Sequence, residues 1–188
     1  MLKLNFLWSI FSLPVVTIGC STIAAYSVTL KMVEKRDAGV AKQFLDAFKA
    51  NWKQGLPMGL ITLVVTYSVY MNWQLFQKVD DNPIIFLLFA ILLGAASLTH
   101  FTYAFALAAR YHNSIVQTFR NSAAISWKYF LQTLLLWFIL LVLAVLFLFN
   151  KTLLFIGLLI GPTSMFLTVS GFAAKFFREL EKERMEDT

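Results

Sequence analysis

The segment from Ser97 to Tyr103 offers the clearest material for chemistry, because the imidazole of His100 stands in the middle of a long uncharged stretch, with Thr99 and Tyr103 close by. Such an imidazole can relay protons or contact a polar substrate. A relay needs a partner acid or base, and the uncharged stretches of this chain hold none. The alternative is a hydrogen bond from a neutral ring to another helix. We expect this structural role, and treat His100, Thr99 and Tyr103 as a candidate intramembrane polar site.

The sequence contains few residues that could support other kinds of chemistry. There is no glycine-rich phosphate loop, no His-Glu-x-x-His motif and no Asp-rich cluster. With two histidines and one cysteine, Cys20, the chain can form neither an intrachain disulfide nor a thiolate metal cluster, and a nucleophile paired with a base is unlikely to arise. We therefore expect a protein that is not an enzyme and that has no catalytic residues, no metal site and no cofactor.

The elements that position these residues are five stretches without Asp, Glu, Lys or Arg: 4–30, 55–77, 84–109, 129–149 and 152–174. Each has at least 21 residues, which as a helix crosses a hydrocarbon core of roughly 30 Å. The hydrophobic content of 59% excludes an ordinary soluble domain. We predict an all-α polytopic membrane protein, a single membrane domain over residues 1–188 with five transmembrane helices and a cytoplasmic tail at 175–188.

The cations between these stretches predict the orientation. Six Lys and Arg lie in 31–54, three in 110–128 and four in the tail, against one each at Lys3, Lys78 and Lys151. The positive-inside rule then places the amino terminus outside and the carboxy terminus in the cytoplasm. Because the basic residues flank the spans, attraction to the lipid bilayer explains the net charge of +6 without nucleic acid. The expected location is the cell membrane, crossed several times.

Both cation-rich loops have the apolar spacing of amphipathic surface helices. Val40, Phe44, Phe48 and Trp52 recur every four residues in the first loop, and Ile115, Phe119, Ala123 and Trp127 do so in the second, at a constant offset of 75. This offset predicts a degenerate parallel repeat, and chance similarity of two amphipathic helices is the alternative. Aromatic residues on such helices either dock a partner or anchor the helix at the interface. The candidate docking surface comprises Phe44, Phe48, Trp52, Phe119 and Trp127.

Small residues and prolines mark where the spans approach each other or bend. Gly55 with Gly59, Gly157 with Gly161, and the cluster Gly94-Ala95-Ala96-Ser97 permit close helix contact, within the chain or with a partner, including a second copy. Pro14 and Pro162 lie inside the first and fifth stretches. Each is predicted to kink its helix and free a backbone carbonyl, which neighbouring Ser and Thr residues can satisfy.

The segment Asn5-Phe-Leu-Trp-Ser-Ile-Phe-Ser-Leu-Pro-Val-Val-Thr-Ile-Gly-Cys-Ser-Thr22 resembles the opening of the YesL-like family of bacterial membrane proteins. Phe44, Phe48 and Lys53, and later Arg110-Tyr111, are similar to the family's further pattern. The chain departs from it at Cys20, where a small residue such as Ala is more usual, and in its short lead before the first span. The resemblance implies a bacterial polytopic protein with an accessory role in oligosaccharide import by ABC transporters.

Three functions follow as hypotheses. The first is a non-catalytic accessory subunit that packs against the permease of a carbohydrate ABC importer. The second is a stand-alone channel or transporter for small solutes, with His100 and the kinked spans along the path. The third is a regulator or assembly factor that acts through the tail. We favour the first, because the spans contain no fixed charge that could couple transport to an ion.

Overall fold

A computed structural model describes residues 1–36, 39–79 and 83–186, and these ranges form helices and no strand. Five of the helical segments are long and apolar enough to cross a membrane, which confirms the prediction of an all-helical, multi-pass membrane protein. The elements are α1 (Leu2–Ser12), a 3-10 turn η1 (Val15–Thr17), α2 (Ile18–Val33), α3 (Val40–Ala50), α4 (Trp52–Lys78), α5 (Ile84–Phe101), α6 (Ala104–Arg110), α7 (Ile115–Lys128), α8 (Phe130–Leu148) and α9 (Lys151–Glu186).

The first uncharged stretch, 4–30, is two helices and not the single kinked span predicted from the sequence. α1 ends at Ser12 and α2 begins at Ile18, with Pro14 in the break. The chain reverses there, since the Trp8 indole donates to Thr22 and the Ser21 hydroxyl donates to the carbonyl of Phe11 at 2.8 Å. Pro14 shapes the break because it has no N–H and fixes its own φ. α1 therefore lies antiparallel to α2.

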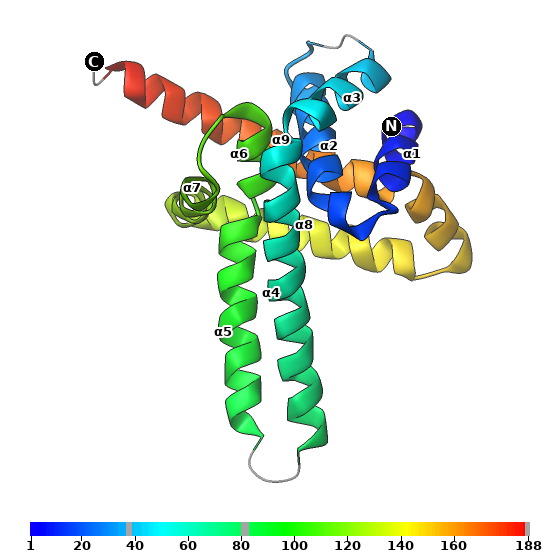
Figure 1. Cartoon of the computed structure of the whole chain (residues 1–188), viewed down its shortest axis with the longest axis vertical. Coiled ribbons are helices and arrows are strands. Elements are labelled where there is room, and N and C mark those ends of the chain that lie inside the picture. Colours follow the sequence, from blue (N-terminus) through cyan, green and yellow to red (C-terminus); the bar gives the residue numbers. More distant parts are fainter. Residues whose placement is uncertain (37–38, 80–82, 187–188) are drawn as a thin grey trace.

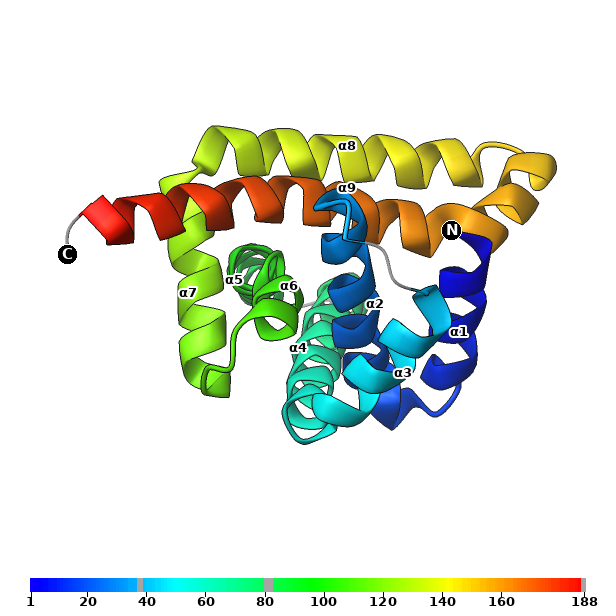
Figure 2. The same ribbon diagram turned by 90° about the horizontal axis from the view of Figure 1, so that it is seen from above.

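Helix α2 lies at the centre of the body, packed against α1, α3, α4, α6 and α9 (Figure 2). Its closest neighbour is α4, where the two backbones touch. A Cβ on Gly19 would lie 2.1 Å from the carbonyl oxygen of Gly55 and 2.7 Å from the Cα of Gly59. Only residues without a side chain allow this approach, which is the usual role of small residues between membrane helices. Gly55 and Gly59 thus form a close helix contact within the chain, as their spacing predicted.

The two apolar hairpins extend in different directions from this body. In Figure 1, α4 and α5 run side by side away from the rest of the molecule, while α8 and α9 lie across them. Seen from above in Figure 2, α8 and α9 extend lengthwise and α4 and α5 appear nearly end-on. The positive-inside pattern predicts that the turns of both hairpins lie on the same side of the membrane. In the structure the α8–α9 turn projects sideways and does not lie beside the far end of the α4–α5 hairpin.

The direction of α9 follows from its aromatic and small residues, which form one core with α2, α6 and α7. Val169, Ala173, Phe176 and Phe177 of α9 are buried in it together with Tyr26, Tyr103 and Ile125. The Phe176 ring stacks on Tyr129 with centroids 4.2 Å apart. α8 packs on the other side of α9, where Gly157 makes room for Phe147. Burial of these side chains fixes α9 across the body.

Pro162 lies inside the continuous helix α9, and the group it frees is satisfied by another helix. Without an N–H, Pro162 leaves the carbonyl of Leu158, four residues earlier, without its helical donor. The side-chain amide of Asn5 donates to this oxygen at 2.7 Å and to the carbonyl of Leu159 at 2.9 Å. Asn5 is 4% exposed. A buried polar residue of α1 thus joins the amino-terminal helix to the proline site.

Replacing Gly19 with Ala should destabilise the protein by about 1–3 kcal/mol, because the added methyl group displaces the α4 backbone. The control is Gly171→Ala in α9, since nothing lies within 4 Å of a Cβ built there. That variant should be as stable as the parent or slightly more so, because Ala favours a helix over Gly. Thermal unfolding in detergent measures both, and equal midpoints for the two variants would contradict the backbone contact.

The Asn5–Pro162 pairing predicts a non-additive double-mutant cycle. Asn5→Ala should cost about 1–3 kcal/mol in the parent, because it leaves the Leu158 carbonyl unsatisfied. In a Pro162→Ala background the cost should shrink, since the new amide at 162 can pair with that carbonyl. Unfolding free energies of the four proteins test this, with Asn72→Ala, whose amide bonds to Ser68 of its own helix, as a control that should not depend on position 162. An unchanged cost of Asn5→Ala in both backgrounds would refute the pairing.

Candidate functional site

The predicted polar site around His100 is divided between the outside and the inside of the protein. His100 is exposed on α5, and its Nδ1 lies 2.8 Å from the carbonyl oxygen of Ala96 and 3.2 Å from the hydroxyl of Thr99, both in the same helix. Tyr103 is fully buried, and its hydroxyl lies 3.1 Å from that of Thr133 in α8. The structure therefore does not bring His100 and Tyr103 to a common cavity.

The stretch 84–109 is interrupted at the same place, a feature that the sequence analysis missed. α5 ends at Phe101 and α6 begins at Ala104. In a continuous helix the N–H of Tyr103 would donate to the carbonyl of Thr99. Here Tyr103 N donates to the Ser122 hydroxyl at 3.1 Å, and the Ser126 hydroxyl donates to the Thr99 carbonyl at 3.0 Å. Two serines four residues apart on α7 replace the missing bond, and their spacing was the available signal.

The predicted docking residues of the first loop lie on different surfaces. Phe44 has no exposed surface, because it packs with Leu4, Ala24 and Val28 in the core between α1, α2 and α3. Phe48 is half-buried, and the ring of Phe11 lies 5.0 Å from it and 5.6 Å from Phe44. These two phenylalanines attach α3 to the body, so little of either can face a partner.

Of the remaining docking candidates, the two tryptophans are exposed and the phenylalanine is not. Trp52 is 53% exposed and Trp127 is 67% exposed. Phe119 is half-buried against Phe101, with ring centroids 5.1 Å apart. The structure does not gather the five residues into one patch. Exposed tryptophans at the starts or ends of membrane helices suit either an interfacial anchor or a partner contact.

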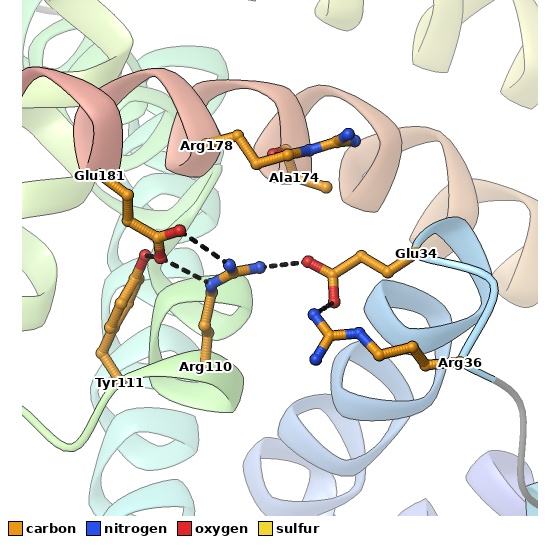
Figure 3. A network of polar contacts seen from close by, with 7 residues as sticks. All are labelled: Glu34, Arg36, Arg110, Tyr111, Ala174, Arg178 and Glu181. Carbon is orange, nitrogen blue, oxygen red and sulfur yellow. Dashed lines mark hydrogen bonds and ion pairs between the residues drawn. The ribbon is translucent and has the colours of Figure 1, made fainter.

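Charged side chains from three helices meet at the ends of α2, α6 and α9 (Figure 3). Arg110, the last residue of α6, donates to Glu34 at 2.5 Å and to both carboxylate oxygens of Glu181 at 3.2 and 3.1 Å. Glu34 also pairs with Arg36, and the Tyr111 hydroxyl donates to Glu181 at 2.5 Å. We call Glu34, Arg36, Arg110, Tyr111 and Glu181 the Arg110 cluster. It connects the tail to both cation-rich loops.

The surroundings of the cluster hold its members in the charge states that the ion pairs need. Burial raises the pKa of Glu34, but the hydrogen bond and charge of Arg110, together with Arg36, outweigh it, so the pKa lies below its ordinary value of 4.5. Burial and the hydrogen bond to Glu181 raise the pKa of Tyr111 to about 12. Glu34 is therefore ionised and Tyr111 remains a donor at neutral pH.

A pocket of about 400 Å³ opens beside the Arg110 cluster, between α6, α7 and α9. Its apolar wall comes from Leu107, Ile125, Phe177 and Leu180, while Asn113, Asn121, Lys128 and Glu181 supply polar groups. An apolar pocket with a few polar groups is the general character of binding sites of this size. The described residues contain no group of three or more His, Cys, Asp or Glu that could hold a metal ion.

The tail forms part of this site. α9 continues to Glu186, so the tail is a helical extension of the last span as far as the structure describes it. Phe176 and Phe177 are buried, and Glu183 pairs with Lys128 of α7 at 2.5 Å. A deletion starting at residue 176, the test that the regulator hypothesis suggests, would remove core side chains as well as the tail.

Comparisons with known proteins give one match. Residues 1–73, which reach from α1 into α4, match the sequence model of a family described as a protein of unknown function, DUF624. No curated protein and no solved structure matches the chain.

The Arg110 cluster predicts a pH-dependent contribution to stability. Because the folded-state pKa of Glu34 is lowered, its ion pair stabilises above the ordinary pKa of 4.5, and this stabilisation is lost as the pH falls through the folded value. Glu34→Gln should therefore cost about 1–3 kcal/mol at neutral pH. The difference from the parent should shrink as the pH falls below about 4.

Unfolding free energies of the parent and Glu34→Gln across this pH range provide the measurement. Glu186→Gln is the matched control, since Glu186 is exposed at the end of α9, and its effect should be small at every pH. A difference between Glu34→Gln and the parent that stays constant with pH would mean that the charge of Glu34 does not stabilise the fold.

Proposed function

We propose that the protein is a non-catalytic accessory subunit of the bacterial cell membrane that packs against a second membrane protein through its α4–α5 hairpin. The partner we propose is the permease of a carbohydrate ABC importer, which the resemblance to the YesL-like family implies. The observation that supports the proposal is the hairpin itself, which extends away from the body and leaves most of its surface uncovered (Figure 1).

The exposed surface of α5 has the character of a helix-packing surface. Large apolar side chains are exposed along it, among them Leu88, Ile91 and Leu92 at 53%, 56% and 66%. Lipid chains could cover these residues equally well. Ala95 and Ala96 are also exposed, next to Gly94, where nothing lies within 4 Å of a Cβ. Small residues provide little contact with lipid but let a second helix approach closely, so they favour a protein partner.

The charge distribution supports an orientation for this contact. The cation-rich segments that include α3, the end of α6 and the tail gather at the end of the body opposite the far end of the hairpin (Figure 1). We propose that this end faces the cytoplasm, as the positive-inside rule expects. The hairpin then points from the cytoplasmic face into the bilayer, where a permease would present its own helices.

Co-purification tests the proposal. The tagged chain, co-expressed with a carbohydrate ABC permease and extracted in mild detergent, should retain the permease. Ala95→Leu should reduce retention by tenfold or more, because the larger side chain blocks close helix contact, a loss of about 1.4 kcal/mol. Its own folding should be unaffected, since position 95 is exposed.

The matched control is Ile91→Leu, one helical turn away on the same exposed surface, which conserves volume and should retain the permease. Failure of the parent chain to retain a permease would count against the partner. Equal retention by Ala95→Leu and Ile91→Leu would count against the proposed surface.

A further inference from the structure

A polar groove lies where α2, α3 and α6 meet, and Arg110 is among the residues that line it. It encloses about 290 Å³, and the small side chains of Ala47, Ala50, Ala108 and Ala109 form its walls. Two further hollows of about 270 and 340 Å³ share Lys31 with it; the first extends toward Glu34 at the end of α2, and the second toward Lys42 in α3. The groove therefore offers room for a small polar group beside the cation-rich end of α2.

The clearest indication that the groove binds a ligand is the side chain of Gln43, which lines it from α3. Gln43 is 8% exposed, and its Oε1 is buried without a hydrogen-bond partner. Its Nε2 has no partner within the described part of the chain either. A carbonyl oxygen kept from water without a donor is costly, and such groups are rare in native proteins. A ligand that donates a hydrogen bond to this oxygen would satisfy it.

The electrostatics of the groove favour a negatively charged ligand. Lys31 and Lys42 form no ion pair with any described residue. Arg36 and Arg110 also line the extended groove and share the carboxylate of Glu34. Asp46 is the other acid on the lining, so the cations outnumber the acids.

The start of α3 adds to this attraction. Its N-cap is Gly39, which has no side chain to cap the helix, and its first turn contains no acidic residue. The free N–H groups and the positive end of the helix dipole at Val40 are therefore not neutralised by the helix's own side chains, an arrangement that favours anions.

We propose that this groove binds a phosphate ester that carries a free hydroxyl group. The phosphate would lie between Lys31 and Lys42 near the start of α3, and the hydroxyl would donate to the Gln43 amide. Two sources offer this chemistry: the glycerophosphate headgroup of an anionic lipid, which the position beside the apolar helix α2 favours, and a free sugar or glycerol phosphate. The groove is distinct from the α4–α5 surface, so the proposal does not depend on the permease partner.

Ligand-dependent stability of the purified full-length protein in neutral detergent tests the proposal. Dihexanoyl-phosphatidylglycerol, dihexanoyl-phosphatidylcholine and glycerol 3-phosphate are titrated separately, and the rise in unfolding midpoint gives an apparent Kd. Phosphatidylglycerol should bind saturably and at least tenfold more tightly than phosphatidylcholine, which lacks the free hydroxyl and the net charge. Lys31→Ala and Lys42→Ala should each weaken binding about tenfold.

Two further variants distinguish an effect on ligand binding from a general effect of charge and from an effect on folding. Lys49→Ala makes the same charge change on α3 away from the groove lining, and it should leave the Kd unchanged. Gln43→Leu has nearly the same shape without the unsatisfied amide. It should leave the free protein as stable or more stable, and still weaken binding, a combination that a purely structural residue would not produce.

The outcomes decide both the site and the source. Saturable binding of phosphatidylglycerol that is lost in the Lys31 and Lys42 variants supports the groove with a lipid headgroup as ligand. The same dependence with glycerol 3-phosphate at equal or higher affinity supports the groove with a free phosphate ester. Absence of saturable binding, or an equal loss in Lys49→Ala, would overturn the proposal.

Discussion

The backbones of α2 and α4 are in direct contact, and this contact determines how the other helices can be placed. Gly19 meets Gly55 and Gly59 without any intervening side chain, so the first residues of α4 have a fixed position relative to α2. The other neighbours of α2 then pack around it: α1 and α3 on one core, α6 and α9 on another. Because α4 begins at this contact, its glycines also determine where the exposed α4–α5 hairpin leaves the body.

Where the helical hydrogen-bond pattern is interrupted, polar side chains from other helices pair with the backbone groups that are left free. The break at Pro14 is closed by Thr17 and Ser21, which donate to the carbonyl of Phe11. The Asn5 amide donates to the carbonyl that Pro162 leaves without a donor. Ser122 and Ser126 pair with the free backbone groups at the break before Tyr103. A bilayer offers no water to these backbone groups, so each interruption of the pattern requires a protein partner. These hydrogen bonds connect α1 to α9 and α5 to α7.

The sequence predicted the class of protein well and the arrangement of its parts less well. Uncharged length is a local property, so the sequence located five candidate spans, the first of which is Val15–Val33 and not the whole of 4–30, and the loop helices at 40–50 and 115–128. The reversal at Pro14 and the position of α8 and α9 across the body depend on packing between distant residues, such as Phe176 against Tyr129. The charge pattern predicts on which side of the membrane each loop lies, but it does not predict contacts between distant residues.

For the candidate site, too, the sequence predicted local features but not the contacts between distant segments. Aromatic spacing predicted that Phe44 and Trp52 share one helical surface, but the structure buries Phe44 in the core and places Trp52 in the next helix, α4, where it is exposed. The Arg110 cluster could not be predicted, because Glu34, Arg110 and Glu181 come from three separate charged segments that the sequence treats as solvated flanks. Their pairing becomes visible only when α2, α6 and α9 are placed side by side (Figure 3).

If the exposed surface of α5 contacts a permease, as we propose, site-specific photo-cross-linking should detect the contact. A photoreactive residue at position 95 should cross-link to the co-expressed permease within the membrane. The same residue at Val116, which is 78% exposed at the start of α7, should not. Cross-linking to the permease from position 116 alone, or only to lipid from position 95, would contradict the account.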